Sequence, residues 1–133
     1  MDRDLRRIVC DRARNRCEYC NLQQAHVPLV LYTVDHVLPK QHGGTDEEAN
    51  LAFACYRCNL HKGPNLAGID PESGEMVALF NPRQQSWPDH FARIGAFIVG
   101  LTPTGRTTVR VLAMNAPERR ELRQELIDNG ELE

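Results

Sequence analysis

The sequence predicts an α+β fold in a single domain, residues 1–133, and three observations support this. Segments rich in β-branched residues are interspersed with segments whose apolar residues recur at helical spacing. Hydrophobic residues make up 41% of the chain and charged residues 26%, which is typical of globular and not of disordered proteins. Four of the five cysteines form two Cys-x-x-Cys pairs, which indicates a cross-link or a metal site that holds the fold together.

Charge and hydropathy narrow the classes of function. No apolar run approaches the roughly 18 residues of a membrane span, and residues 1–16 lack the apolar core of a secretory signal. We therefore expect a cytoplasmic protein with no membrane partner. The net charge is −2, so charge alone does not indicate nucleic-acid binding. Residues 1–16 carry six Arg and three Asp, and this basic segment either contacts phosphates or forms the solvated face of a helix.

The paired cysteines are Cys17, Cys20, Cys55 and Cys58, with 34 residues between the pairs. Each pair places two thiolates on one tight turn, which suits one edge of a zinc tetrahedron. Two disulfides would need an oxidising compartment, and a thioredoxin-like site would need one pair at a strand–helix junction. The sequence therefore favours structural zinc, and the long insert between the pairs should be a folded unit. Cys10 is left over and reads as a small core residue on a helix.

The N-terminal elements follow from local patterns. Residues 3–14 read as a helix with Leu5, Ile8 and Val9 on one side, within an N-terminal segment of residues 1–16. Residues 29–34 are β-branched and apolar and therefore read as a strand.

The rest of the cysteine-framed core, residues 17–63, reads as a loop and a helix. Pro39 stops strand pairing, and the glycines near residue 43 indicate a loop. Thr45 or Asp46 can cap a short helix. Residues 56–62 read as a second helix, which Gly63 ends.

Polar residues concentrate in this core. Asp35 and His36 directly follow the predicted strand, Asn50 precedes an apolar run, and Asn59 and His61 follow the last cysteine. Each has an ordinary interpretation by itself, as a turn residue, a helix cap or a surface histidine. All of them together, in this order between and just after the two cysteine pairs, are harder to explain by chance than any one of them alone.

These residues resemble the HNH endonuclease family, in the form with two Cys-x-x-Cys zinc knuckles found in small free-standing microbial members. The similarity runs from Cys17 to Gly63, and residues 64–133 carry no signature. It implies a ββα-metal core, two strands and a helix that hold one divalent cation against the scissile phosphate. It also implies cleavage that leaves 5′-phosphate and 3′-hydroxyl ends.

The resemblance assigns roles to the polar residues. His36 takes the position of the general base, and its ordinary pKa of about 6.5 suits proton transfer near neutral pH. Asp35 and Asn59 take the positions of ligands to a catalytic Mg²⁺ or Mn²⁺. Asn50 takes the position of the middle asparagine, which orients the loop and the base. Lys62 lies one helical turn after Asn59 and is either a phosphate contact or a plain solvated lysine.

Two questions of geometry stay open in the sequence. Read literally, His61 is the third residue of the motif name, whereas alignment on the second cysteine pair favours Asn59. The two lie about 200° apart on a helix, so only one can face the cation. Asp35 and His36 are neighbours on a strand and would point to opposite faces unless the strand twists or ends there.

Residues 64–133 read as an extension of loops, strands and helices. Residues 65–86 are mostly loop with a strand at 76–80, and residues 91–101 form one long strand or a strand pair. Residues 102–113 are assigned to a helix, although a strand also fits part of them. A capping box at residues 115–118 begins a last helix that ends at Gly130. Trp87 and Phe91 read as core aromatics, with base stacking as the alternative.

The expected function is metal-dependent endonuclease activity on nucleic acid, with DNA as the partner. The alternatives are a zinc-built nucleic-acid-binding module without catalysis and a protein-interaction domain. The complete set of Asp35, His36, Asn50 and Asn59 favours the nuclease, because a binding module needs no base beside an aspartate.

Overall fold

The computed structural model describes residues 2–133. This part of the chain contains three two-stranded antiparallel sheets and five α-helices. The helices are α1 (Arg3–Arg12), α2 (Tyr56–Lys62), α3 (Trp87–His90), α4 (Pro103–Val111) and α5 (Pro117–Asp128). The strands are β1 (Thr33–His36), β2 (Leu51–Ala54), β3 (Ala67–Ile69), β4 (Met76–Ala78), β5 (Phe91–Ile94) and β6 (Phe97–Gly100). The predicted α+β class is confirmed.

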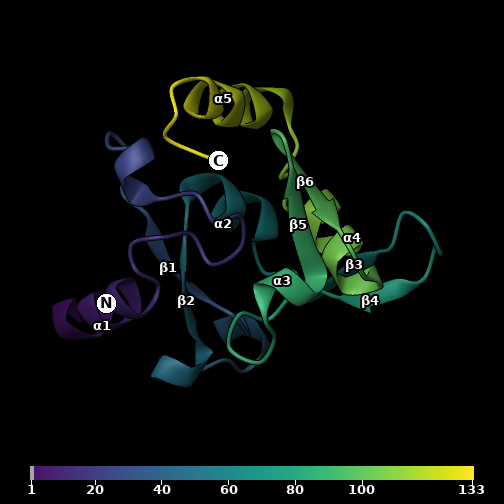
Figure 1. Cartoon of the computed structure of the whole chain (residues 1–133). Coiled ribbons are helices and arrows are strands. Elements are labelled where there is room, and N and C mark those ends of the chain that lie inside the picture. The colour runs from purple at the N-terminus through teal and green to yellow at the C-terminus, as the bar shows by residue number, and fades with distance from the viewer. Residues whose placement is uncertain (1) are drawn as a thin grey trace.

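The chain forms two halves that lie side by side (Figure 1). One half holds α1, β1, β2 and α2, and the other holds the β3–β4 and β5–β6 hairpins with α3 and α4. Helix α5 lies across the top of this view, and its Arg119 reaches Cys58 of α2. The extension after residue 64 therefore packs back onto the cysteine-framed core.

Strands β1 and β2 and helix α2 form the ββα unit that the resemblance implies. Thr33 pairs with Ala54 and His36 with Leu51, and all four residues of β2 are buried. Helix α2 begins after Cys55, whose side chain accepts a hydrogen bond from the backbone N–H of Cys58. The predicted helix over residues 56–62 is confirmed.

The strand predicted over residues 29–34 is wrong in its position. Its partner β2 ends at Ala54, so residues before Thr33 have no strand beside them. The Gln24 side chain instead donates to the carbonyls of Val27 and Val30 and accepts from the backbone N–H of Tyr32. The strand therefore starts later and includes Asp35 and His36 as its last two residues.

The capped helix predicted after Thr45 is also wrong. A single 3₁₀ turn, Glu48–Asn50, stands there, and no side chain caps it. Thr45 Oγ1 accepts a bond from the backbone N–H of Glu47, whereas the Asp46 carboxylate contacts His36. The competing contact removes the cap that the local sequence offers.

Two predictions for residues 64–133 are confirmed. Strands β5 and β6 form the expected strand pair, and α4 is the helix expected over residues 102–113. The Thr102 hydroxyl accepts from the backbone N–H of Gly105 and caps α4, and Gly95 turns β5 into β6. Strand β3 was not expected. The Asn115 side chain bonds the backbone N–H and carbonyl of Ile98, so it cannot form the predicted capping box, and α5 begins without a side-chain cap.

The hydrophobic core joins both halves. Phe91 is buried and stacks on Trp87, whose indole N–H donates to the Tyr19 carbonyl at 2.8 Å. Phe91 is therefore a core residue and Trp87 packs, partly buried, against the core, as expected. Cys10 lies on α1 and packs, partly buried, against this core. Among the described residues, no helix is long and apolar enough for a membrane span.

Candidate metal centres and catalytic site

The four paired cysteines converge on one point of the core. The sulfur atoms of Cys17, Cys20, Cys55 and Cys58 all lie within 4.8 Å of one another, and all four residues are buried. The Cys20 and Cys55 sulfurs are 3.8 Å apart. Zinc–sulfur bonds of about 2.3 Å in a tetrahedron give sulfur separations of about 3.8 Å. The donor set therefore fits structural zinc.

The burial of these thiols and the N–H groups directed at their sulfurs favour a bound cation. Burial raises the pKa of the Cys17 and Cys58 thiols well above their usual value. A bound metal would deprotonate them and offset part of their negative charge. Backbone N–H groups already point at the sulfurs, from Cys20 to Cys17 Sγ and from Cys58 to Cys55 Sγ, as in a zinc knuckle.

The extension adds a positive charge to this centre. Arg119, at the start of α5, donates to Cys58 Sγ at 3.0 Å and contacts Cys55 Sγ at 3.8 Å. Its guanidinium also donates to the Leu112 carbonyl at 2.7 Å. Burial lowers the pKa of Arg119, but the thiolates outweigh burial and raise it, so the residue stays charged.

A second candidate site lies where β1 ends against α2. A cavity of about 310 Å³ has Asp35, His36 and Asn59 among its lining residues, with Lys40 at the same opening. Since β1 ends at His36, the two neighbours border the cavity together although they point to different sides of the strand. The strand end thus resolves the geometric difficulty that the sequence posed.

Asp35 is held from inside the protein and is only 7% exposed. The Tyr19 hydroxyl donates to Asp35 Oδ2 at 2.7 Å, and Lys62 Nζ lies 3.1 Å from the same oxygen. Lys62 Nζ also donates to Oδ1 at 3.4 Å. Both carboxylate oxygens therefore have a donor, and the bond from Tyr19 is the shorter.

His36 has a carboxylate partner that the sequence did not reveal. Its Nε2 atom lies 2.6 Å from Asp46 Oδ1, and Lys40 Nζ lies 3.2 Å from the same oxygen. The hydrogen bond from His36, followed by that from Lys40, lowers the pKa of the Asp46 carboxyl. An ionised carboxylate only accepts hydrogen bonds, so Nε2 carries a proton, and in the neutral ring Nδ1 is the nitrogen that holds a free lone pair.

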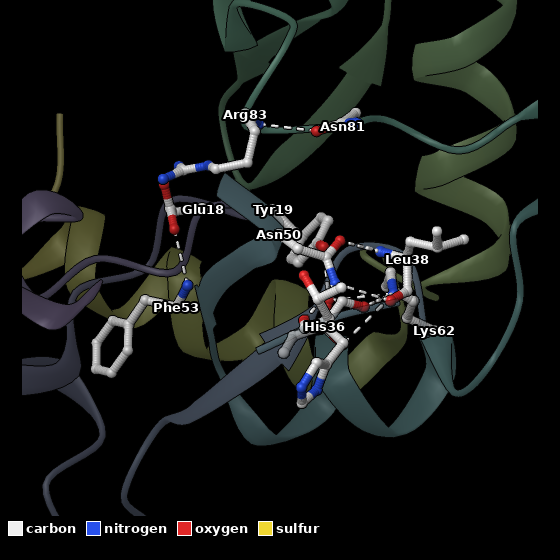
Figure 2. A network of polar contacts seen from close by, with 11 residues as sticks. Glu18, Tyr19, His36, Leu38, Asn50, Phe53, Lys62, Asn81 and Arg83 are labelled. Carbon is white, nitrogen blue, oxygen red and sulfur yellow. Dashed lines mark hydrogen bonds and ion pairs between the residues drawn. The ribbon is translucent and has the colours of Figure 1, made fainter. Parts of the chain in front are cut away.

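Asn50 holds the loop between the two strands and does not line the cavity. Its Oδ1 accepts from the Leu38 N–H, and its Nδ2 donates to the carbonyls of Leu38 and Thr45 (Figure 2). The His36 ring extends away from this amide in the same view. A side chain at Gly44 would meet the Leu38 carbonyl at 1.6 Å, so this loop requires glycine there.

The remaining candidate residues lie on different faces of helix α2. Asn59 lines the cavity, and the hydrogen bonds found within residues 2–133 leave its side-chain amide unused. His61 is exposed and is not among the lining residues. Lys62 is only 2% exposed and also donates to the His36 carbonyl at 3.1 Å. The solvated-lysine interpretation of Lys62 is therefore wrong, and its buried ammonium does not line the cavity as a phosphate contact would.

Three residues of the two centres escaped sequence reasoning. Tyr19 carried a weak signal, since it stands between two zinc cysteines. Asp46 read as a helix cap, and Arg119 lay in an acidic terminal segment with no motif. Nothing local marks a contact that spans 61 residues, as that between Arg119 and Cys58 does.

Comparison with known families agrees with this geometry. Residues 17–65 match the family described as HNH endonuclease, so the chain contains an HNH endonuclease domain with a four-cysteine cluster consistent with zinc. Such domains indicate a nuclease acting on nucleic acid, and HNH nucleases generally use a divalent metal ion. No curated protein and no solved structure matched the chain.

Proposed function

We propose that the chain is an endonuclease that hydrolyses phosphodiester bonds in DNA, with a catalytic Mg²⁺ or Mn²⁺ held by Asp35 and Asn59 and with His36 as the general base. One observation carries the proposal. Asp35, His36 and Asn59 come from a strand and a helix, yet they line one open cavity of about 310 Å³.

The donor atoms suit a hard divalent cation. Asp35 offers a carboxylate at the cavity, and the Asn59 side chain offers an amide oxygen free of other hydrogen bonds within residues 2–133. Mg²⁺ and Mn²⁺ prefer such oxygen ligands and keep several positions for water and phosphate. When bound, the cation would stabilise the negative charge that develops on the phosphate and the leaving oxygen.

His36 supplies the proton transfer. Because Asp46 accepts from Nε2–H, the lone pair of Nδ1 is free to take a proton from a water molecule. The water oxygen forms a bond to phosphorus, the bond from phosphorus to the 3′ oxygen breaks, and the leaving oxygen receives a proton from solvent. Asn50 keeps the loop that carries Asp46 in place.

Lys40 gives the cavity opening a positive charge. Its side chain is 64% exposed and contacts Asp46, so it can turn toward a phosphate of the bound strand. This placement supports nucleic acid as the substrate despite the net charge of −2.

The test is a plasmid-nicking assay with zinc-loaded protein in Mg²⁺, Mn²⁺ or EDTA. His36→Ala should cut roughly 10²–10⁴-fold more slowly with little change in DNA affinity. Asn59→Ala should weaken cation binding, so excess Mn²⁺ should restore part of its rate. His61→Ala is the matched control on the same helix and should cut as the wild type does.

Two outcomes would contradict the proposal. Loss of cutting in His61→Ala but not in Asn59→Ala would make His61 the third motif residue. Zinc-loaded wild type that binds DNA but cuts no nucleic acid with any divalent cation would instead be a binding module.

A further inference from the structure

Tyr19 connects the zinc centre to the candidate catalytic centre. It lies between the zinc cysteines Cys17 and Cys20, and its whole side chain is buried. Its hydroxyl nevertheless reaches Asp35 on β1, where it donates to Oδ2 at 2.7 Å. One residue of the knuckle therefore touches both centres.

The other end of Tyr19 is held as firmly. Its carbonyl accepts a bond of 2.8 Å from the Trp87 indole, and its neighbour Glu18 accepts from the Phe53 N–H at 2.7 Å and pairs with Arg83. Figure 2 shows Glu18 between Arg83 and Phe53. The position of the phenol is thus set by the knuckle, β2 and the extension together.

The contacts on Asp35 are divided between its two oxygens. Tyr19 donates to Oδ2 at 2.7 Å, whereas Lys62 Nζ donates to Oδ1 at 3.4 Å and lies 3.1 Å from Oδ2. A donor on each oxygen restricts rotation of the carboxylate. The bond from Tyr19 is the shorter of the two hydrogen bonds that hold it.

We propose that Tyr19 is a positioning residue, which ties the Asp35 carboxylate to the zinc knuckle and so sets the cation affinity of the catalytic cavity. The inference rests on the proposed function only in taking Asp35 as a cation ligand. Residues that hydrogen-bond a metal ligand typically change metal affinity by about 10- to 100-fold when they are removed.

The test compares two Tyr→Phe variants, each of which lacks one phenolic hydroxyl group. Tyr19→Phe removes the donor to Asp35 and keeps the buried ring. Tyr32→Phe is the matched control, because Tyr32 is 1% exposed and its hydroxyl donates at 2.9 Å to the Leu22 carbonyl, away from Asp35. The readout is the Kd for Mn²⁺ by calorimetry on zinc-loaded protein without DNA, with zinc content and thermal midpoint recorded for each variant.

We expect Tyr19→Phe to weaken Mn²⁺ binding by roughly 10- to 100-fold, with zinc content unchanged and the cutting rate recovering at high Mn²⁺. Tyr32→Phe should bind Mn²⁺ as the wild type does. Replacing Tyr19 with p-aminophenylalanine returns a donor at the same place and should restore the affinity. This second variant also separates loss of the donor from loss of the fold.

The result that overturns the inference is a Tyr19→Phe protein with wild-type Mn²⁺ affinity, or an equal loss in Tyr32→Phe. Failure of p-aminophenylalanine to restore affinity overturns it too. Wild type that binds Mn²⁺ but cuts no nucleic acid refutes the proposed function, while the Kd values still decide the role of Tyr19. Wild type that binds no Mn²⁺ refutes both.

Discussion

Arg119→Met is expected to weaken zinc binding by roughly 10- to 100-fold, although Arg119 lies 61 residues beyond Cys58. A zinc ion with four thiolates carries a net charge of −2, and the buried Arg119 guanidinium lies directly against it. Methionine keeps an unbranched apolar stem of similar width but removes the charge and every donor.

The magnitude follows from one lost contact. Arg119 donates to Cys58 Sγ at 3.0 Å, whereas its 3.8 Å contact with Cys55 Sγ is weaker. A hydrogen bond to a charged group contributes about 1.5–3 kcal/mol. Since about 1.4 kcal/mol corresponds to a factor of ten in an equilibrium constant, one such bond accounts for the expected loss.

Arg123→Met is the matched control. Arg123 lies one turn later on α5, is 5% exposed where Arg119 is 7% exposed, and donates to the carbonyls of Ala96 and Met114 and to Asn115 Oδ1. No bond from it to a zinc cysteine is found within residues 2–133. Both variants should lower the thermal midpoint, because both leave buried carbonyls without a donor.

The assay is competition for zinc with a chromophoric chelator, at a temperature where both variants are folded. Zinc binding is coupled to folding, so a loss shared by the two variants measures destabilisation alone. The additional loss in Arg119→Met measures the contact with the thiolate. Equal zinc affinities in the two variants would refute a role of Arg119 in the zinc centre.

Three further predictions concern other parts of the chain. Asp46→Asn should slow cleavage roughly 10- to 100-fold, less than the ~10⁴-fold loss in a buried Ser-His-Asp triad because Asp46 is exposed; single-turnover rates equal to wild type would contradict this. The hydrogen bonds from Arg106 hold the pKa of Asp70 well below its usual value, so their stabilisation is complete above about pH 4 and disappears as pH falls further. Thermal melts should show a lower midpoint for Asp70→Asn than for wild type at pH 7 and a smaller difference between the two midpoints in acid; a difference that does not change with pH would contradict this prediction. By elemental analysis, Cys58→Ser should lose zinc and fold poorly while Cys10→Ser keeps its zinc, and zinc loss in Cys10→Ser would mean that the wrong cysteines were paired.

Local sequence patterns were enough to predict those parts of the site that depend on residues close together in the chain. The cysteine spacing predicted the cluster of four sulfurs, and residues 56–62 together with Gly63 predicted α2 and its end. Helical geometry predicted that Asn59 and His61 lie on opposite faces of that helix, and alignment on the second cysteine pair favoured Asn59. Such features depend on residues a few positions apart, so the sequence displays them directly.

The strand that carries Asp35 and His36 could not be placed in this way. Residues 29–34 have the composition of a strand, yet pairing depends on β2, and Gln24 takes the backbone groups before Thr33. A strand needs a partner, and the partner's length is a property of the tertiary structure. The strand end at His36, which brings both residues to one cavity, therefore had to be observed.

The contacts that prepare the two centres belong entirely to the tertiary structure. Tyr19 reaches Asp35 across 16 positions, and Arg119 reaches Cys58 across 61. The sequence by itself determined the candidate metal ligands and the candidate base. Which residues hydrogen-bond Asp35, which carboxylate contacts His36, and which charge lies against the cysteine sulfurs depend on long-range packing, because each is decided by a partner that no local pattern specifies.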